Sequence, residues 1–495
     1  NADKPFDRFV SEQIAGDELD PANHEFLTAS IFHRLGPVRR NAGNTDIALS
    51  RNEVLTERTD IVGAAFLGLT VGCARCHNHK LEPISQRDYY CLQAYLAATD
   101  EHNIALASAA EQSAWEAETQ KLKDEIQEVK KRARVATGVE REKLNMQVED
   151  LEDHLPPPLA TIPATRNDFA NRTAIHVLKR GVWENKGEAV GLRPPGILVP
   201  DDTPELAPDE SRPRTRLAQW LTSPQHPLTA RVIVNRLWQQ HFGNGLVKTP
   251  NDFGLHGEKP SHPELLDWLA ATLVENGWRL KPIHRLILLS STYQQSCLSP
   301  GHQEEDDRDP ENRWLAHFKR RRLSAEEVRD AMLAVSGRLN VKAGGPSVVV
   351  PVDAELVGLL YKPSQWAVTA DPREHDRRSV YLIAKRNLRL PFFESLDAPA
   401  LQTSCARRES STHSPQALEL LNGGLSNDLA RALANRLERE CDGAPERIVE
   451  RAFLLALGRP PTAAEKARSL MFLQEQPVGE FALAMFNLNG FLYAP

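Results

Sequence analysis

Apolar positions recur at helical spacing along most of the chain, and this pattern predicts a mainly α, multidomain protein. In the second half, the periodic stretches are separated by loops rich in Gly, Pro and Asn; they are 214–221, 230–241, 263–276 and 282–290. Ser324 and Glu327 form the S-x-x-E pattern of a capping box, which predicts a helix starting there. Three or four further helices are expected over 414–492.

The longest helical pattern covers residues 108–155 and has the seven-residue repeat of a coiled coil. Its apolar positions step by four and three residues, from Trp115 to Ala133 and again from Leu144 to Leu155. Thr137-Gly138 interrupts the repeat, and prolines follow at 156–158. An antiparallel helical hairpin is therefore expected, either as a structural strut or as an arm that binds a partner.

Stretches rich in Pro and β-forming residues interrupt the helical pattern and predict a smaller β-containing middle region. Short strands are expected at 175–178, 196–200 and 379–383. These changes in texture divide the chain into six expected segments: 1–104, 105–158, 159–213, 214–340, 341–405 and 406–495. In the first segment, Asp60 is expected to cap a helix beginning at Ile61, and Ser85 to start another.

Composition narrows the class of protein. The 495 residues carry 60 Lys and Arg against 67 Asp and Glu, a net charge of −7. This mildly acidic balance argues against nucleic-acid binding, which usually shows a basic excess. No apolar run reaches the roughly 18 residues of a membrane span, so none is expected. With 41% hydrophobic residues, the chain has enough apolar material for sizeable cores.

Two of the six cysteines form a chemical motif. Cys73-Ala74-Arg75-Cys76-His77 matches C-x-x-C-H, the pattern of covalent haem attachment. From the six Cys and 16 His of this chain, chance produces such a match on the order of 0.002 times. Two thiols on one turn bind the haem vinyl groups, and the next His presents its imidazole to the iron. Cys73 and Cys76 are therefore the predicted anchors of a c-type haem, and His77 is its predicted proximal iron ligand.

Other chemistry at this motif stays open. Zinc is a minor alternative, because Cys73, Cys76, His77 and His79 are all zinc-ligand types, although structural zinc sites usually draw ligands from two separated segments. A redox-active dithiol or an inert motif is a further alternative. His79 lies too close to His77 to reach the opposite haem face. We expect it to contact a haem propionate, to support a ligand or to lie at the surface.

Polar residues elsewhere have plainer interpretations. The sequence does not identify a sixth haem ligand, since the four methionines lie far from the motif in sequence. Arg236 and His241 belong to a polar cluster in the second half, but their spacing of five places them on different helix faces. Hydrogen bonding between helices is the expected role of this cluster. The remaining cysteines are expected to be small buried side chains, with a disulfide among them as the alternative; they are Cys91, Cys297, Cys405 and Cys441.

Several long stretches resemble a known family. Residues 1–9 (NADKPFDRF), 15–19 (AGDEL) and 66–90, which include the C-x-x-C-H motif, resemble the planctomycete cytochrome-c-like proteins of unknown function. Later stretches resemble the C-terminal domain of unknown function that habitually accompanies them; they are 217–257, 260–269, 321–332, 377–386, 416–418 and 457–462. The resemblance implies haem on Cys73, Cys76 and His77, and export to the periplasm or cell surface. It also implies a chain truncated at Asn1, because family members extend further upstream.

Together these features predict an exported c-type haem protein that transfers electrons or carries out a haem-dependent redox reaction. As an enzyme it would be of the oxidoreductase type. Its partner would be a redox protein, or it would act on a small molecule or polysaccharide, and an oligomer is compatible with this. One alternative is a carbohydrate-binding or hydrolytic surface protein in which the motif holds a structural haem or metal. A second alternative is a cell-surface assembly protein.

Overall fold

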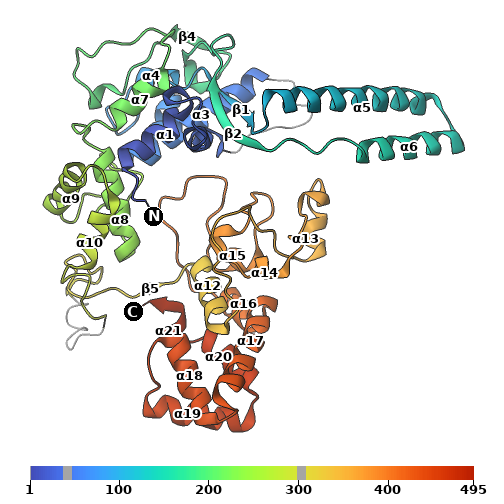
Figure 1. Cartoon of the computed structure of the whole chain (residues 1–495). Helices are drawn as coiled ribbons and strands as arrows, with labels where there is room; N and C mark the ends of the chain where they lie inside the picture. Colours follow the sequence, from blue (N-terminus) through green and yellow to red (C-terminus); the bar gives the residue numbers. More distant parts are fainter. Residues whose placement is uncertain (1, 37–46, 298–307, 495) are drawn as a thin grey trace. The chain divides into compact units, whose positions relative to one another are not determined.

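The computed structural model of the chain describes residues 2–36, 47–297 and 308–494 (Figure 1). The chain divides into two compact units. The first comprises Asn1–Ala230 with Gly254–His256 and Ala271–Leu280, and the second comprises Arg231–Phe253, Gly257–Ala270 and Lys281–Pro495. The expected division into six shorter segments stays a prediction.

The fold is mainly helical, as the sequence predicts, and its strands form small antiparallel pairs. β1 (Thr99–Ala105) pairs with β2 (Thr161–Asn167), β3 (His176–Leu178) with β4 (Lys186–Ala189), and β5 (Arg321–Arg322) with β6 (Tyr493–Ala494). Within the described ranges, no helix has both the length and the apolar character needed to cross a membrane.

The first unit is built from helices before and after the β1–β2 pair. They are α1 (Phe6–Leu19), α2 (His24–Ala29), η1 (Ser30–Arg34), α3 (Ile47–Val62), η2 (Gly63–Leu67), η3 (Val71–Arg75), α4 (Gln86–Ala94), η4 (Lys179–Gly181), η5 (Gly196–Leu198) and α7 (Pro213–Leu221). α1 contacts α2, α7 and β2, and α3 contacts α4. These helices bury apolar side chains such as Ile14, Leu55 and Leu217, so the unit has its own core.

A buried arginine connects the end of α1 to the start of α7. The guanidinium of Arg214 donates to both carboxylate oxygens of Asp17, at 2.6 and 2.7 Å, and to Asn167 Oδ1 on β2 at 2.9 Å. The carboxylate of Glu18 accepts from the backbone N–H of Arg214 and Thr215. It therefore satisfies N–H groups at the N-terminus of α7 that have no partner within the helix.

The close packing of α1 on α2 depends on a glycine. A Cβ at Gly16 would lie only 2.1 Å from the carbonyl oxygen of Phe26. Any side chain at this position would therefore push the two backbones apart. Gly16, Asp17 and Glu18 lie in the AGDEL stretch, so this stretch has a structural role in the first unit.

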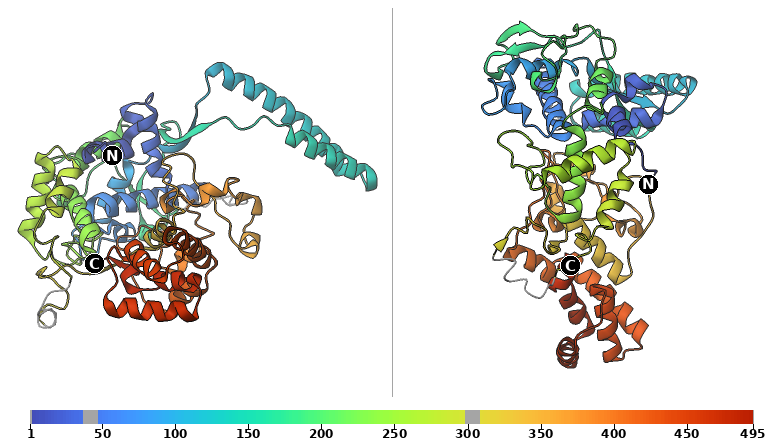
Figure 2. Two further views of the ribbon diagram at one scale, coloured as in Figure 1. Left: turned by 60° about the horizontal axis from the view of Figure 1, so that its bottom comes forward. Right: turned by 90° about the vertical axis from the view of Figure 1, so that its left-hand side faces the viewer.

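The predicted hairpin is present as α5 (Ala109–Val135) and α6 (Gly138–Asp153), two antiparallel helices that lie side by side (Figures 1 and 2). Its buried seam contains Ile126, Val129, Ala133, Leu144 and Val148, which are positions of the seven-residue repeat. The indole Nε1 of Trp115 donates to the carbonyl of Pro157 at 2.8 Å. The chain leaving the hairpin is thereby bound to the first part of α5.

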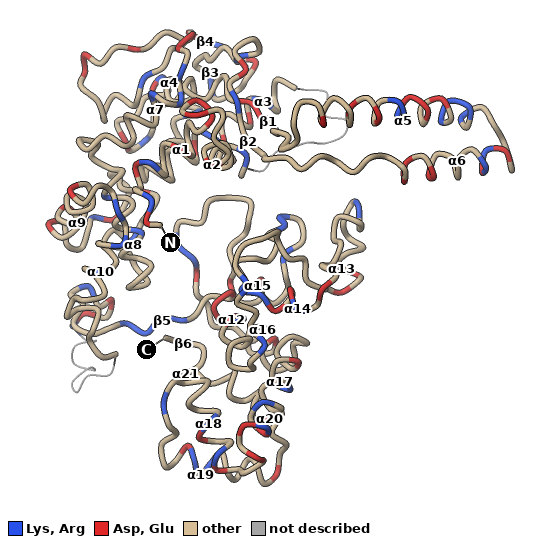
Figure 3. The backbone as a smooth tube through the Cα atoms, in the orientation of Figure 1, with Lys and Arg blue, Asp and Glu red and all other residues tan. Residues whose placement is uncertain are grey.

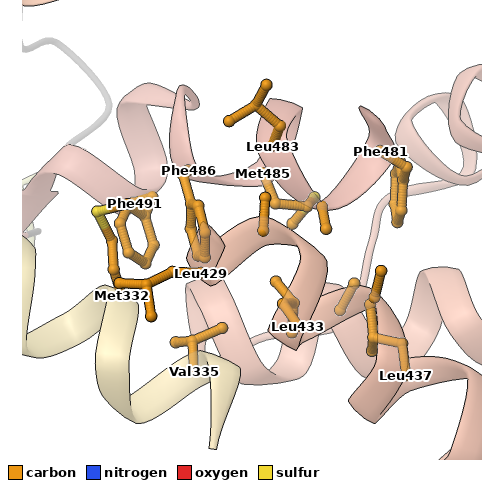
Figure 4. Close-up of a cluster of buried hydrophobic side chains, with 14 of the residues drawn as sticks. Met332, Val335, Leu429, Leu433, Leu437, Phe481, Leu483, Met485, Phe486 and Phe491 are labelled. Carbon is orange, nitrogen blue, oxygen red and sulfur yellow. The ribbon is translucent and has the colours of Figure 1, made fainter. Parts of the chain in front are cut away.

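The second unit continues the helical pattern. Its helices, including three that begin or end in the first unit, are α8 (Thr229–Phe242), α9 (Pro263–Glu275), α10 (Leu280–Leu288), α12 (Ala325–Ser336), α13 (Ala354–Gly358), η6 (Pro363–Gln365), α14 (Pro372–His375), η7 (Ser379–Tyr381), α15 (Pro391–Ser395), α16 (Ser414–Asn422), α17 (Gly424–Cys441), α18 (Pro445–Leu457), α19 (Ala463–Glu475), α20 (Val478–Phe486) and α21 (Asn489–Leu492). Its core lies where α12, α17 and α20 meet, around Met332, Leu433 and Phe486 (Figure 4).

Two predictions about helices were wrong. Asp60 does not cap a new helix, because it lies in the last turn of α3, which continues into the π-helical turn η2 and ends at Gly68 with φ 58°. A left-handed glycine is a common helix stop, so the apolar run after Asp60 is the end of a helix. Over 414–492 the structure has six helices, α16 to α21, because loops at Gly423 and Pro477 divide the expected elements.

Two predicted strands were also wrong. Gly196–Leu198 forms the 3-10 helix η5, between Pro195 and Pro200, and proline cannot donate to a strand partner. Ser379–Tyr381 forms the 3-10 helix η7. The backbone N–H and the hydroxyl of Ser379 both donate to the carboxylate of Asp330, at 2.7 and 2.6 Å. Of the predicted strand, only Leu382 forms an isolated β-bridge, with Val348.

Candidate functional site

The Cys73–His77 segment lies where a short helix ends, as expected. Val71–Arg75 is the 3-10 helix η3, and Cys76 is its C-terminal cap. Three residues make one turn of such a helix, so Cys73 and Cys76 lie on the same side. Both thiols are free and exposed, whereas Ala74 between them is fully buried. The turn therefore exposes two unpaired thiols on one side, while Ala74 on the other side packs into the interior.

Side chains of helix α4 form hydrogen bonds to this turn. The carbonyl oxygen of Arg75 accepts from the side-chain amide of Gln86 at 2.8 Å and from the hydroxyl of Tyr90 at 2.9 Å. The same Gln86 amide also donates to the carbonyl of Leu178 on β3. Burial raises the pKa of Tyr90 to about 12, which keeps its phenol protonated as a donor. The predicted start of α4 is confirmed, since Ser85 and Asp88 form a capping box.

The connection between β3 and β4 approaches one of the thiols. A Cβ at Gly181 would lie 2.7 Å from Cys76 Sγ, and Gly181 has φ +70°. Both the close approach and the left-handed backbone require glycine. Sequence reasoning missed Gly181, because no local pattern connects it to a cysteine 105 residues earlier.

One ring nitrogen of His77 forms a hydrogen bond within the protein, and the other points away from this hydrogen bond. Its Nδ1 lies 2.6 Å from the carbonyl oxygen of Asn78, which can only accept, so Nδ1 carries the hydrogen. In the neutral ring, Nε2 then has the free lone pair that a metal needs. The imidazole is exposed. This orientation suits a ligand that binds iron through Nε2.

His79 has a different environment. Its Nδ1 accepts from the backbone N–H of Glu82 at 2.8 Å and of Leu81 at 3.2 Å, and its Nε2 lies 3.5 Å from Thr70 Oγ1. The ring thus shapes the loop that follows the motif. These contacts do not distinguish the three roles expected for His79, which stay predictions.

Asp60 is a neighbour of the motif that sequence reasoning assigned to another role. Its carboxylate accepts from the hydroxyl of Tyr89 at 3.1 Å and would lie 3.0 Å from a Cβ at Gly72. Burial raises the pKa of Asp60 to about 6. A carboxyl group that titrates near pH 6 therefore lies directly behind the residue preceding Cys73.

The donor set can be tested against the two groups considered for it. In the part of the chain that the structure describes, no three His, Cys, Asp or Glu side chains come together as a metal-binding group. A tetrahedral zinc ion would need its four ligands to converge. Haem attachment needs two separate thiols on one turn and an imidazole directly after it, which is the arrangement of Cys73, Cys76 and His77. These three residues fit haem better than zinc.

The polar cluster of the second half is hydrogen-bonded, but only part of it joins helices as expected, because Val247 and Asn251 lie outside helices. The side chain of Asn235 is buried and forms two hydrogen bonds with the backbone of Val247, at 2.8 and 3.0 Å. Arg236 donates to Asn251, whereas His241 Nε2 lies 2.8 Å from His284 Nδ1. Arg236 and His241 therefore have separate partners. The scattered cysteines are free; Cys91 and Cys441 are buried as expected, but Cys405 is exposed.

Comparison with known proteins identifies two families of unknown function in one chain, as the resemblance suggested. Residues 1–101 match PSCyt2, described as a protein of unknown function (DUF1549), and residues 213–473 match PSD1, described as a protein of unknown function (DUF1553). No curated protein and no solved structure matches significantly. The PSD1 match covers more than half of the residues of the chain. The chain therefore belongs to the PSD1 family of proteins of unknown function.

Proposed function

We propose that this chain is an exported c-type haem protein that transfers electrons or carries out a haem-dependent redox reaction. Cys73 and Cys76 would hold the haem covalently, and His77 would bind its iron. The observation that carries this proposal is a single turn with two exposed, unpaired thiols, followed by an imidazole whose Nδ1 is already hydrogen-bonded. Location in the periplasm or at the cell surface is part of the proposal and rests on the family resemblance.

The residues of the chain have distinct tasks in this proposal. Gln86 and Tyr90 hold the carbonyl of Arg75, so the turn that carries both thiols keeps its shape. Asn78 orients the ring of His77 through its carbonyl group. When bound, the haem supplies one-electron chemistry, with a potential set by its axial ligands and its burial.

The proposal is tested by a pyridine haemochrome spectrum. The chain is exported in a bacterium that has cytochrome c maturation proteins, then purified and denatured. We expect a covalent c-type spectrum with about one haem per chain. The double variant Cys73→Ala/Cys76→Ala should lose it. Cys405→Ala, which removes an exposed free thiol outside the motif, should keep it.

Other results would contradict the proposal. A wild-type chain without covalent haem after maturation would overturn it. About one zinc per chain by elemental analysis, lost in the double variant, would assign the site to zinc. If haem is present, exposing the reduced protein to carbon monoxide separates the two activities. A shifted spectrum indicates an open iron position and favours a redox reaction, whereas an unchanged spectrum favours electron transfer.

A further inference from the structure

We propose that the α5–α6 hairpin is a self-association arm, through which two copies of this chain pair in antiparallel orientation. In this pairing, the basic tip of each hairpin faces the acidic shaft of the other. We define the hairpin tip as residues 129–148 and the hairpin shaft as residues 109–128 and 149–155. This pairing uses the hairpin alone and is independent of haem.

The hairpin tip is basic. It carries six basic residues against Glu140 and Glu142, a net charge of +4; the six are Lys130, Lys131, Arg132, Arg134, Arg141 and Lys143. All six side chains are exposed, and the blue segments gather near the turn between α5 and α6 (Figure 3). In a chain with a net charge of −7, such a concentration of positive charge favours an acidic partner.

The hairpin shaft has the opposite charge. Ten acidic residues face only Lys121 and Lys123, a net charge of −8; the ten are Glu111, Glu116, Glu118, Asp124, Glu125, Glu128, Glu149, Asp150, Glu152 and Asp153. Within the hairpin, Lys130 pairs with Glu152 and Lys131 with Glu128, each at 2.6 Å. Among the described residues, Arg132, Arg134, Arg141 and Lys143 form no ion pair, so most of the tip charge is left for a partner.

Apart from the two ion pairs near their border, the charges of tip and shaft lie too far apart to neutralise each other. At 1.5 Å per residue, their centres on α5 are about 20 Å apart. This exceeds the screening length of about 8 Å at physiological salt, so each patch acts on its own surroundings. A second hairpin in antiparallel orientation brings each tip onto a shaft, whereas a parallel one brings like charges together. The antiparallel arrangement also has the two-fold symmetry that most dimers use.

Apolar side chains on the hairpin tip point to the same pairing. Val135 is 83% exposed, and Val139 and Met146 are each 69% exposed. Val139 and Met146 are seven residues apart and share the outer side of α6. The inner seam is already filled by the contacts of α5 with α6, so a second copy would cover this outer side. Burial of these three side chains adds a hydrophobic contribution to the charge attraction.

Sedimentation velocity of the full chain at about 100 µM tests the proposal. The wild type should be a dimer whose dissociation constant rises at least about tenfold between about 50 and about 500 mM salt. The tip-reversed variant Arg132→Glu/Arg134→Glu/Arg141→Glu should be monomeric. The shaft-reversed variant Glu116→Lys/Glu118→Lys/Glu125→Lys/Glu149→Lys/Asp150→Lys, whose five exposed substitutions change the shaft charge from −8 to +2, should also be monomeric. Mixed together, the two variants should form a heterodimer, since each tip again meets an oppositely charged shaft. Heterodimer formation also shows that both variants are folded.

A matched control separates complementarity from total charge. Lys121→Glu/Lys123→Glu makes the molecule more acidic but strengthens the shaft, so its dimer should persist. A monomeric wild type would overturn the proposal, as would two variants that still dimerise alone or do not pair when mixed. If a monomeric wild type binds dextran sulfate and the tip-reversed variant does not, the arm binds an acidic polymer instead of a second copy.

Discussion

At the scale of single residues, the environment of Asp60 disfavours the charged form of its carboxyl group. The carboxylate lies against Gly72 and accepts one hydrogen bond from Tyr89, and burial raises its pKa to about 6. An aspartate in the unfolded chain titrates near pH 4. The folded state therefore binds more protons than the unfolded state between about pH 4 and 6, and this residue's contribution to stability falls as pH rises through that range.

Asp60→Asn should therefore stabilise the protein at neutral pH. The amide oxygen still accepts from Tyr89, but no charge has to be buried. We expect the free energy of unfolding at pH 7 to rise by about 2 kcal/mol and its pH dependence between about 4 and 6 to flatten. Urea unfolding across this range measures both. Asp168→Asn is the control, because an exposed carboxylate whose pKa is lowered by Asn171 gives a pH dependence of opposite sign. Parallel pH curves for wild type and Asp60→Asn would contradict the argument.

At the scale of elements, buried polar groups connect helices and strands that are distant in sequence. Arg214 on α7 is fully buried and binds Asp17 of α1 and Asn167 of β2. Removing one partner of a buried ion pair leaves the other charge without compensation, which is more costly than the net contribution of the pair. The relative placement of α1, β2 and α7 therefore depends strongly on this one side chain.

Arg214→Ala should lower the free energy of unfolding of the first unit by about 3–5 kcal/mol. Arg216→Ala is the matched control on the same helix. Its side chain is 55% exposed and lies 3.6 Å from Glu210, so its loss should cost at most about 1 kcal/mol. Hydrogen exchange of α1 and α7 measures the opening free energy in each variant. If both substitutions lowered the opening free energy equally, burial of the Arg214–Asp17 pair would not determine the stability of the first unit.

At the scale of the whole molecule, each unit has its own buried apolar residues. In the second unit, Leu433 of α17 is fully buried among residues of α12, α18 and α20. The helices of the first unit bury a separate set that includes Ile14 and Leu55. We therefore expect destabilisation of one core to act mainly on its own unit.

Leu433→Ala should destabilise the second unit by about 2–5 kcal/mol, because it removes buried methyl groups and leaves a cavity. Hydrogen exchange should accelerate in α12, α17, α18 and α20, while α1 and α4 stay as protected as in the wild type. Leu454→Ala on α18 removes a side chain that is 51% exposed and should have a smaller effect. An increase spread evenly over both units would contradict the separation into two cores.

The sequence by itself determined features that depend on neighbours along the chain. The hairpin follows from its seven-residue repeat, α4 and α12 follow from their capping boxes, and the turn at Cys73 follows from its short motif. Hydrogen bonds and side-chain spacing within a few residues decide such elements. For the same reason, the haem proposal was available from five consecutive residues.

Only the tertiary structure decided which distant residues meet. Asp17 and Arg214 are 197 residues apart, and Gly181 reaches Cys76 from another hairpin. β1 was missed because its partner β2 lies beyond the α5–α6 hairpin, and 379–383 was misassigned because the backbone N–H of Ser379 binds Asp330. Burial set the pKa of Asp60 in the same way. Each of these depends on packing between elements, which brings together groups that no local pattern relates.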